Sequence, residues 1–281
     1  MIPIKKNKYT AWLHWNISAQ CNFDCTYCFG KIPVNRSELR EIDIEKLLGT
    51  LEKDGRIFRI SFTGGEPFLI PNIVEACAAI TKKHFVSFNS NLVLPNVEKF
   101  ADRINPERVV FIQASFHSRE LEGKKLFDKY LTNFQLLKSR GFEILAEAVA
   151  FPTDYELHDK YKIILKENGI DLKFAPFVGS LNSKKYPQSY SPAEIIKYGL
   201  DEERIKAHFQ KGKLCNAGFN ASVVYSNGDV YPCFQIKEKM GSVNDGIEFS
   251  DTLRKCPAKF CGRPLNNYDR RLFELGIVSR Q

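Results

Sequence analysis

The sequence lacks any apolar run long enough to cross a membrane, and its first residues, Met1–Lys8, lack the apolar core of a secretory signal peptide. It also contains no internal sequence repeat and no low-complexity segment, which excludes repeat arrays and compositionally disordered chains. Basic residues outnumber acidic ones by 41 to 33, but they are scattered and form no stripe with interleaved aromatic residues. These absences predict a cytoplasmic protein that binds neither membrane nor nucleic acid.

What the sequence does contain is the composition of a globular protein. Of its 281 residues, 43% are hydrophobic and 12% aromatic, which is enough for one sizeable domain with a full core and a small appendage. The net charge of +8 mildly favours an anionic substrate, since an excess of one charge attracts the other. Eight cysteines in clustered spacings, without a secretion signal, favour metal binding over disulfides.

Three of the cysteines, Cys21, Cys25 and Cys28, lie close together directly after an alternating apolar segment, Thr10–Ser18, that predicts a strand. A loop this short can wrap three thiolates round one corner of a metal cluster. No fourth cysteine, histidine or carboxylate follows nearby at ligand spacing, whereas structural zinc sites are usually closed by four protein ligands. Three ligands indicate an iron–sulfur cluster with one iron left open, and a zinc knuckle is the alternative.

This CxxxCxxC loop, with the aromatic Tyr27 before its last cysteine, resembles the CxxxCxΦC signature of the radical S-adenosylmethionine (SAM) superfamily. A second motif follows a predicted strand at Ile57–Thr63. It consists of Gly64, Gly65, Glu66 and Pro67 and resembles the GGE motif of the same family. The two glycines permit a close backbone approach that a side chain would forbid. The resemblance implies that this segment holds the amino group of the methionine moiety of SAM, and that Tyr27 and Phe29 belong to the same cofactor site.

Six strand-like segments alternate with helical segments as far as about residue 205. The predicted strands are Thr10–Ser18, Ile57–Thr63, Phe85–Asn89, Val109–Ser115, Ile144–Ala150 and Leu172–Phe177. Strands that alternate with helices form βαβ units and a parallel sheet. The pattern therefore predicts an α/β fold, and the family resemblance independently implies a partial (β/α)6 TIM-like barrel over residues 1–205.

Signals for helix ends support this alternation. A helix predicted at Pro71–Lys83 opens with proline in its first turn, and capping boxes are predicted at Thr153–Glu156 and Ser191–Glu194. Gly141 and Gly169 stand where glycines are expected after the last turn of a helix.

The predicted strands are polar on one face, although strands covered on both faces of a parallel sheet should be almost continuously apolar. His14 opposes Leu13 and Trp15 in the first strand, Arg59 opposes Phe58 and Ile60 in the second, and Glu147 interrupts the fifth. If the sheet curls into a barrel, this face lines a polar lumen for SAM and a polar substrate, with hydrogen bonding at strand ends as the alternative. His14, Arg59 and Glu147 are accordingly candidate substrate or catalytic residues.

Two strand ends add candidates by resemblance. Asn89 stands where relatives often carry a QTNG-like strand end that touches SAM, and Ser115 matches a serine that often contacts SAM at the end of strand four. Relatives commonly read SLDG from this serine onward, whereas this sequence reads Ser-Phe-His-Ser over residues 115–118. His117 is therefore a departure from the family pattern and a candidate substrate contact or proton carrier. Cys77 shares a helical face with Ile73 and is predicted to pack in the core.

From Lys206 the alternation stops, and four cysteines remain, Cys215, Cys233, Cys256 and Cys261. Asn227-Gly228 between two β-rich runs predicts a hairpin, whose central turn positions need positive φ. The order of these cysteines resembles the SPASM/twitch extensions of radical SAM enzymes in their shorter, four-cysteine form. The resemblance implies a small hairpin-and-helix extension over residues 206–281 that binds a second 4Fe–4S cluster, with tetrahedral zinc on the same cysteines as the alternative.

The resemblance also implies a reaction. A 4Fe–4S cluster on Cys21, Cys25 and Cys28 would bind SAM at its open iron, and reductive cleavage of SAM would yield a 5′-deoxyadenosyl radical that abstracts a hydrogen atom from a polar substrate. We expect the substrate to be oxidised next, by dehydrogenation or by bond or ring formation, with the second cluster as electron acceptor. The alternatives are redox-neutral or crosslinking modification of a ribosomally made peptide, and a non-enzymatic zinc- or RNA-binding protein.

The expected partners follow from this reaction. They are a polar small-molecule or peptide substrate and an electron donor such as flavodoxin or ferredoxin. Only twenty residues precede Cys21, so a peptide substrate is expected to need a separate recognition partner.

Overall fold

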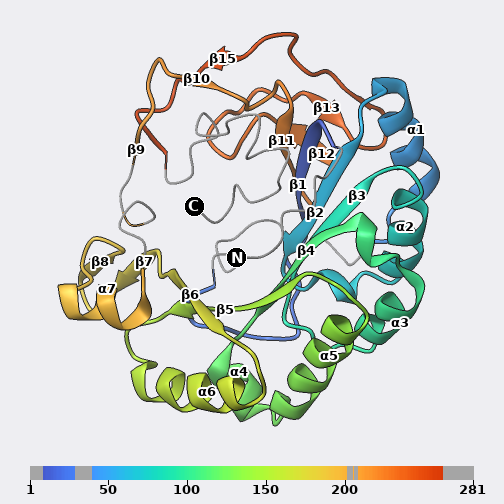
Figure 1. The fold of residues 1–281 in the computed structure, drawn as a ribbon. Helices are drawn as coiled ribbons and strands as arrows, with labels where there is room; N and C mark the ends of the chain where they lie inside the picture. Colours follow the sequence, from blue (N-terminus) through green and yellow to red (C-terminus); the bar gives the residue numbers. More distant parts are fainter. Residues whose placement is uncertain (1–8, 29–39, 201–204, 206–207, 262–281) are drawn as a thin grey trace.

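Six parallel strands form the centre of the molecule (Figure 1). The computed structural model describes residues 9–28, 40–200, 205 and 208–261. The six strands are β1 (Ala11–Ser18), β2 (Phe58–Gly64), β3 (Phe85–Ser90), β4 (Val109–Ser115), β5 (Ile144–Ala150) and β6 (Leu172–Pro176). They pair in chain order, so the predicted partial (β/α)6 barrel is confirmed, and each predicted strand agrees with the structure to within about one residue at either end.

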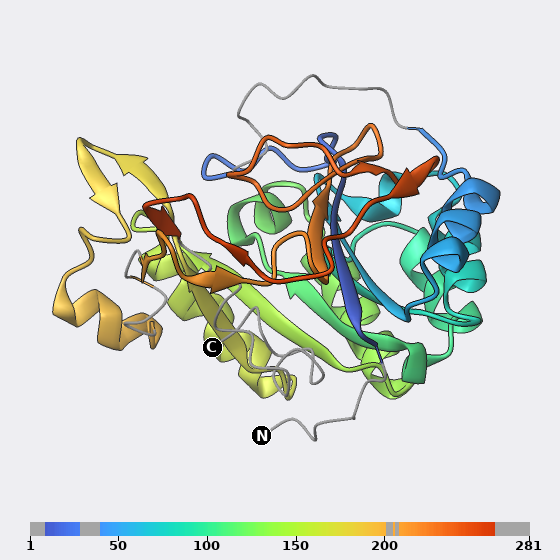
Figure 2. The same ribbon diagram turned by 90° about the horizontal axis from the view of Figure 1, so that it is seen from above.

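Helices cover the outer side of the curved sheet (Figures 1 and 2). They are α1 (Ile44–Asp54), α2 (Ile73–Ile80), α3 (Asn96–Arg103), α4 (Ser118–Gly123), α5 (Phe127–Ser139) and α6 (Tyr155–Glu167). A further helix, α7 (Pro192–Tyr198), follows two short paired strands, β7 (Gly179–Leu181) and β8 (Lys184–Tyr186). In the described part of the chain, no helix has the length and apolar character needed to cross a membrane.

Two of the predicted helix ends are wrong and the others are confirmed. The helix predicted at Pro71–Lys83 is α2, which begins after an N-cap at Asn72, so Pro71 precedes the helix and does not lie in its first turn. Ser191 and Glu194 form a complete capping box, and Gly141 and Gly169 adopt φ of +83° and +70° after α5 and α6. At α6 the predicted box is wrong, because Asp154 rather than Thr153 occupies the N-cap position and its side chain does not cap the helix. Its Oδ1 instead accepts hydrogen bonds from Arg119 Nε at 2.6 Å and from the Thr153 hydroxyl at 3.0 Å.

The strands alternate in burial as their polarity predicts. In β1, Leu13 and Trp15 are buried against the helices, whereas His14 and Asn16 on the opposite face are only partly covered. A polar inner face therefore exists. Towards the N-terminal ends of the strands it is closed by a buried network in which Arg59 Nε donates to Ser87 Oγ and the Ser61 and Ser87 hydroxyls are 2.6 Å apart.

A stack of four phenylalanines joins β2 and β3 to the helical layer. Phe62, Phe68, Phe88 and Phe100 are each at most 1% exposed, and the Phe68 and Phe88 rings stack with centroids 5.0 Å apart. Burying each ring contributes roughly 2–3 kcal/mol relative to leaving it exposed. Phe68 lies in the 3-10 turn η2 (Pro67–Leu69), so this stack anchors the segment that immediately follows the two glycines.

The C-terminal part of the chain extends the same sheet. Strand β11 (Ala221–Val224) pairs in parallel with β1 on the side away from β2, and β12 (Asp229–Tyr231), β13 (Gly241–Ser242) and β14 (Gly246–Ile247) continue in antiparallel order. The predicted hairpin between β11 and β12 is confirmed, but of Asn227 and Gly228 only Gly228 has positive φ, +88°. The turn is a longer loop, in which Tyr225 N–H donates to the Asp229 carbonyl at 2.9 Å.

Two short ladders carry the last cysteines. Strand β10 (Leu214–Cys215) pairs with β15 (Arg254–Lys255), and β9 (His208–Phe209) pairs with β16 (Phe260–Cys261). Figures 1 and 2 show these orange and red segments running from beside β1 towards β7 and β8. The boundary predicted at residue 206 adjoins residues outside the described part, so the division into two domains stays a prediction.

His84 is expected to make the protein less stable as the pH falls. Its side chain is 2% exposed, and its Nδ1 accepts a hydrogen bond from the Phe58 backbone N–H at 3.2 Å. Burial, together with the charges of Lys83 and Arg108, lowers the pKa of His84 to about 4. The unfolded chain takes up this proton near its ordinary pKa of 6.5, so stability is fully present above that pH and is lost towards pH 4, by about 3 kcal/mol.

Urea unfolding at about pH 7.5 and at about pH 5 checks this. The loss at low pH should be smaller in His84→Gln, whose side-chain oxygen can accept the same hydrogen bond but does not titrate. An equal loss in both proteins would assign the effect to other groups, with His158 the first to examine because burial also lowers its pKa to about 4.

Candidate active site

The cysteine loop, residues 19–28, follows directly from the C-terminal end of β1. Cys25 is buried, and Cys21 and Cys28 are exposed. Burial raises the pKa of Cys21 to about 11 and that of Cys25 to about 12, and the charges of Cys28 and of nearby carboxylates raise both further. The loop thus brings its thiols near one another, where negative charge is costly until cations balance it. Three soft sulfur donors in such surroundings fit a cluster of iron ions.

Gly64 and Gly65 lie against the backbone of the cysteine loop. Gly65 N–H donates to the Ser18 carbonyl at 2.6 Å, and Glu66 N–H donates to the Gln20 carbonyl at 2.9 Å. A Cβ atom on Gly65 would lie 1.8 Å from the Gln20 oxygen, and one on Gly64 would lie 2.4 Å from the Ser18 oxygen. The close approach predicted for the two glycines is therefore present, and in this structure it is an approach of the GGE segment to the cysteine loop.

Glu66 secures the other side of this segment. The residue is 1% exposed, and its carboxylate accepts hydrogen bonds from Phe68 N–H at 3.0 Å, Ser90 Oγ at 2.8 Å and Asn91 N–H at 2.8 Å. Burial raises the pKa of Glu66 to about 7 even though all three hydrogen bonds favour the ionised form. Its side chain joins η2 to the end of β3, and Pro67 begins η2 as a buried residue.

Asn91 connects the end of β3 to the cysteine loop. Its Nδ2 donates to Asn22 Oδ1 at 2.8 Å and lies 4.0 Å from Cys21 Sγ. The family resemblance pointed to Asn89 as the residue of this strand end that touches SAM. In the structure, it is Asn91 that contacts the cysteine loop, through Asn22. The sequence signal for this contact was the run of three polar residues at positions 89–91. Strand periodicity alone does not tell which of the three side chains contacts the cysteine loop.

His117 lies between two aromatic side chains of the cysteine loop. Its Nδ1 is 3.0 Å from the Tyr27 hydroxyl, its ring stacks on Tyr27 with centroids 6.0 Å apart, and Phe23 meets it edge-on at 5.8 Å. Burial lowers the pKa of His117 to about 4, so the ring is neutral near pH 7, and burial raises the pKa of Tyr27. The structure therefore places His117 against the loop, where it orients the aromatic residue of the CxxxCxΦC signature.

Removing the Tyr27 hydroxyl is expected to weaken SAM binding. Tyr27→Phe deletes a buried hydrogen bond of about 1 kcal/mol and frees the ring that precedes Cys28, so we expect roughly fivefold weaker binding. Calorimetric titration of the anaerobically reconstituted protein with SAM measures this.

A matched control exists, because Tyr198 makes the same kind of hydrogen bond to His158 Nδ1, at 3.1 Å, on α6 and α7. Tyr198→Phe should cost similar stability and leave SAM binding unchanged. If both variants weaken SAM binding equally, the Tyr27 contact acts only through general stability.

The other predicted lumen residues lie at different depths. Asn89 is opposite Gln113 in the sheet register, and Ser115 is opposite Glu147. Glu147 is 8% exposed and accepts a hydrogen bond from Gln113 Nε2 at 2.5 Å. In the sheet register, Asn89 and Ser115 lie near the C-terminal ends of β3 and β4, and Glu147 lies in the middle of β5.

Arg59 and His14 lie apart from the cysteine loop. Arg59 is 3% exposed near the N-terminal end of β2, at the opposite end of that strand from Gly64. Its Nε donates to Ser87 Oγ at 3.1 Å, and its guanidinium lies over the Trp12 ring, 5.0 Å from the centroid. The His14 ring lies edge-on to Phe234, at 5.9 Å, which directs it towards the segment that contains Cys233. Phe29 lies outside the described residues.

The four C-terminal cysteines gather around Cys215. Burial raises the pKa of Cys215, and the charges of Cys256, Cys233 and Cys261 also raise it, so each of these three thiols is within electrostatic reach of Cys215. Cys256 N–H donates to the Lys213 carbonyl at 2.8 Å, which fixes the pairing of β10 with β15. Among the described side chains, no three His, Cys, Asp or Glu residues are grouped at the spacing of a single-ion site. Four sulfur donors fit a second cluster by their chemistry.

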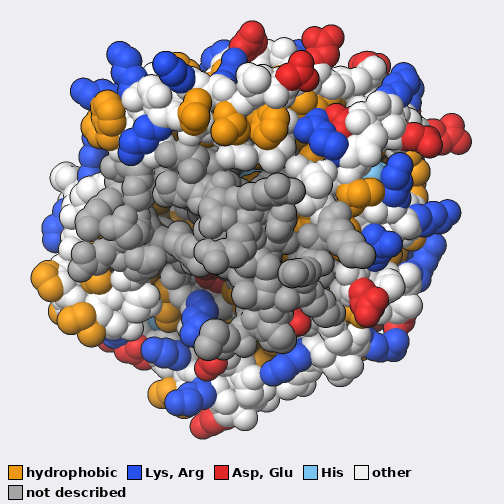
Figure 3. Space-filling view, turned by 45° about the horizontal axis from the view of Figure 1, so that its top comes forward, with side chains coloured by type: hydrophobic (Ala, Val, Ile, Leu, Met, Phe, Trp, Pro, Cys, Tyr) orange, Lys and Arg blue, Asp and Glu red, His pale blue; other side chains and the backbone are white. Residues whose placement is uncertain are grey.

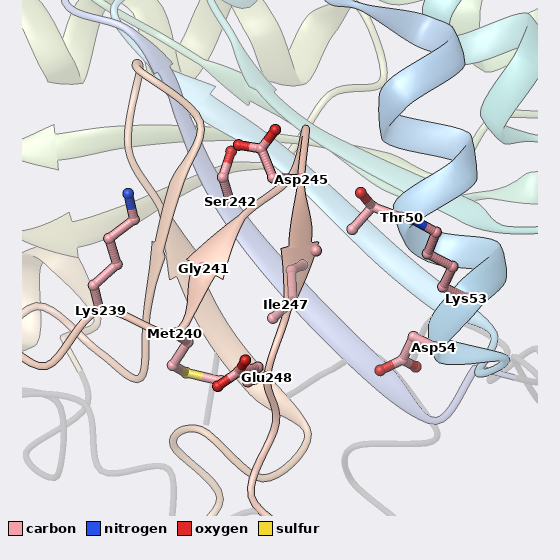
Figure 4. A pocket seen from close by; sticks show the side chains of 11 residues that line it. Thr50, Lys53, Asp54, Lys239, Met240, Gly241, Ser242, Asp245, Ile247 and Glu248 are labelled. Atoms are coloured by element: carbon pink, nitrogen blue, oxygen red, sulfur yellow. The ribbon is translucent and has the colours of Figure 1, made fainter.

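Two surface hollows lie away from both cysteine groups. One, of about 600 Å³, lies between α1 and the β13–β14 hairpin, and its lining includes Lys53 and Asp54 of α1 and Ile247 and Glu248 beside them (Figure 4). The other, of about 830 Å³, lies between α4 and α6. Neither hollow includes a predicted site residue, and their charged, mixed linings distinguish them from the inner face of the barrel.

Residues 15–160 match the family profile described as the radical SAM superfamily. The "Cysteine-type anaerobic sulfatase-maturating enzyme" of Clostridium novyi is 25% identical over 267 aligned positions, covering 77% of this chain and 71% of that protein. The "GTP 3',8-cyclase" of Chlorobaculum tepidum is 38% identical over 60 residues, covering 21% of this chain and only 18% of the cyclase.

Two solved structures show the same fold. "Native anSMEcpe with bound AdoMet" superposes with a TM-score of 0.60 at 20% identity, covering 83% of this chain and 78% of that one. SuiB of Streptococcus suis bound to precursor peptide SuiA has a TM-score of 0.54 at 18% identity, covering 80% and 60%.

Proposed function

The chain belongs to the radical SAM superfamily, and we propose on this basis that it removes a hydrogen atom from a polar substrate and then oxidises that substrate. Membership of the family makes it an enzyme that uses a 4Fe–4S cluster and SAM, which replaces the zinc- or RNA-binding alternative. On the described surface visible in Figure 3, Lys and Arg side chains are spread among side chains of other types.

The cysteine loop supplies the ligands of the proposed cofactor site. Cys21, Cys25 and Cys28 would hold the cluster, which together with SAM supplies a 5′-deoxyadenosyl radical able to take a hydrogen atom from carbon. The chain itself keeps this site in shape. Gly65 permits the GGE segment to touch the loop, and His117 holds the aromatic residue beside it.

The convergence of four thiols at Cys215 carries the oxidation step of the proposal. A substrate that has lost a hydrogen atom is oxidised when it also loses one electron and one proton, which leaves a new double bond, ring or crosslink. A cluster held by four cysteines has no open coordination position and suits electron transfer rather than substrate binding. The cluster that accepts the electron would be held by Cys215, Cys233, Cys256 and Cys261. The carboxylate of Glu147, on the inner face of the sheet beside Gln113, would accept the proton.

A peptide is the substrate we favour. The solved relatives with this fold were crystallised with peptides, the Kp18Cys peptide and the precursor peptide SuiA. The second candidate function is therefore a redox-neutral or crosslinking modification of a ribosomally made peptide at the same cysteine loop. A redox-neutral reaction such as epimerisation needs no electron exit, whereas crosslinking removes one electron and one proton after the hydrogen atom and so needs the C-terminal thiols as that exit.

Replacing two C-terminal cysteines separates these candidates. Cys215→Ala/Cys256→Ala should lose about four irons, should keep SAM cleavage with dithionite within about threefold of the wild type, and should no longer modify a cysteine-containing peptide. Iron and sulfide content, released 5′-deoxyadenosine and the peptide mass are the measurements. Peptide modification at the wild-type rate in this variant would contradict the oxidation step and favour the redox-neutral reaction.

A further inference from the structure

Exposed apolar side chains are concentrated around the C-terminal cysteines. Eight large hydrophobic side chains in the described part of the chain are at least 40% exposed, and five of them belong to the last segment. These five are Phe209, Leu214, Phe234, Leu253 and Phe260. Single exposed apolar residues are ordinary, but a group of them on one small substructure marks an interaction surface.

The two short ladders explain why these side chains are exposed. In β10–β15, Leu214 is opposite Lys255 and Cys215 is opposite Arg254. Successive side chains of a strand point to opposite faces, so the thiol of Cys215 and the side chain of Leu214 lie on opposite sides. Leu214 is 53% exposed and Cys215 is 8% exposed, in agreement with this alternation.

The second ladder repeats the arrangement. Phe260 is opposite Phe209, and the two rings meet edge-on with centroids 6.0 Å apart, while Cys261 follows on the other face. Both rings are 50% exposed. The Gln235 side-chain amide donates to the Phe260 carbonyl at 3.1 Å and so joins the Cys233 segment to this ladder. The faces of the two ladders that carry Leu214, Phe209 and Phe260 are therefore apolar and lie on the opposite side of their strands from Cys215 and Cys261. Together these two faces are called the ladder surface below.

The ladder surface carries charge of one sign. Residues 208–215 and 252–261 include five cations and no aspartate or glutamate. Arg254 pairs with Glu238 at 3.1 Å, whereas the exposed cations of the ladders are Lys211, Lys213, Lys255 and Lys259. An apolar centre bordered by lysines is complementary to a negatively charged protein.

We propose that the ladder surface docks an acidic electron-carrier protein. The inference rests on the proposed function, in which the thiols behind this surface hold a cluster that exchanges electrons. A carrier bound to Phe209, Phe260 and Leu214 lies against the strands that bear those thiols. Single-stranded RNA would also contact lysines and aromatic rings, but the position of the surface over the cysteines favours the protein.

Charge reversal on this surface tests the proposal. Lys213→Glu/Lys255→Glu should weaken binding of a bacterial flavodoxin by about tenfold at low salt, and high salt should remove most of the difference. Phe260→Ser should weaken binding at both salt concentrations, because it removes apolar contact area. Binding is measured by calorimetry with the full-length, anaerobically reconstituted protein.

Exposed residues of α6 provide matched controls. Lys162→Glu/Lys166→Glu changes the net charge by the same amount, and Ile163→Ser removes an exposed apolar side chain that is 61% accessible. These variants should bind flavodoxin within about twofold of the wild type. Equal weakening by both sets of variants, no flavodoxin binding by the wild type, or tighter binding of an oligouridylate through the same lysines would overturn the proposal.

Metal content separates this inference from the proposed function. If the four C-terminal cysteines hold zinc while flavodoxin binding still depends on Lys213 and Lys255, the docking surface stands and the oxidation step fails. If iron content and dithionite-driven peptide modification are complete while flavodoxin binding ignores these lysines, the oxidation step stands and the docking surface fails.

Discussion

Replacing Cys21, Cys25 and Cys28 together by alanine is expected to abolish SAM cleavage and to lower the iron content from about eight to about four atoms per chain. The three thiols share one short loop at the end of β1, and Cys21 and Cys25 each feel the charge of Cys28. No single thiol can be replaced by a neighbouring ligand, because this loop contains no further cysteine or histidine. Iron and sulfide determination after anaerobic purification, together with 5′-deoxyadenosine release, measures both effects.

Cys77→Ala is the control for cysteine loss. Cys77 is 0% exposed in α2, where it packs as a small apolar residue, as the sequence predicts. This variant should keep all iron and full SAM cleavage. About four irons in the wild type and none in the triple variant, with zinc also present, would leave the radical chemistry intact and assign zinc to the C-terminal cysteines. Unchanged iron in the triple variant would disprove the assignment of the loop.

The strands of the barrel could be predicted from the sequence because each carries its own signal. β4 and β5 begin and end where alternation and flanking turn residues predict, and this information is local. The pairing of β11 with β1 carries no comparable signal, since parallel strands far apart in sequence recognise each other only through the assembled sheet. The prediction therefore named the hairpin correctly and missed its place at the edge of the barrel sheet.

Some site residues could be predicted from local sequence, and others depend on the folded structure. The two cysteine groups follow from spacing and family resemblance, but the contacts of Asn22 with Asn91 and of Tyr27 with His117 depend on loop conformation. Arg59 shows the converse. Its place on the polar face was predictable, yet only the structure shows that Trp12 and Ser87 enclose it at the closed end of the barrel.

The capping box at Thr153–Glu156 failed for a reason that lies outside the segment. Its pattern satisfies the local rule, but Arg119 from α4 donates to both the Thr153 hydroxyl and the Asp154 carboxylate, and the Thr153 hydroxyl donates to Asp154, so neither side chain caps the helix. Charge-assisted hydrogen bonds from Arg119 stabilise these side chains by more than the roughly 1 kcal/mol that a helix cap contributes. Residues 153–156 by themselves give no indication that an arginine from another helix lies beside them.

Gly65→Ala is expected to separate the GGE segment from the cysteine loop. The added Cβ would lie 1.8 Å from the Gln20 carbonyl oxygen. The backbone fixes the position of the Cβ, and the oxygen is itself a backbone atom, so no side-chain rotation can relieve the contact. The backbone must move, which lengthens the hydrogen bonds from Gly65 to Ser18 and from Glu66 to Gln20. We expect a loss of about 3 kcal/mol in unfolding free energy and at least about tenfold weaker SAM binding, measured by urea unfolding and by calorimetry.

Gly49→Ala is the matched control, because Gly49 lies within α1 and no atom comes within 4 Å of the position of its Cβ. Alanine there should stabilise the protein by up to about 1 kcal/mol, since glycine is the poorer helix former, and SAM binding should not change. Similar behaviour of both variants would mean that the loop tolerates a wider gap at Gly65. The contrast between them isolates backbone approach from any general effect of adding a methyl group, and so tests whether the contact between the two signature segments is what shapes the SAM site.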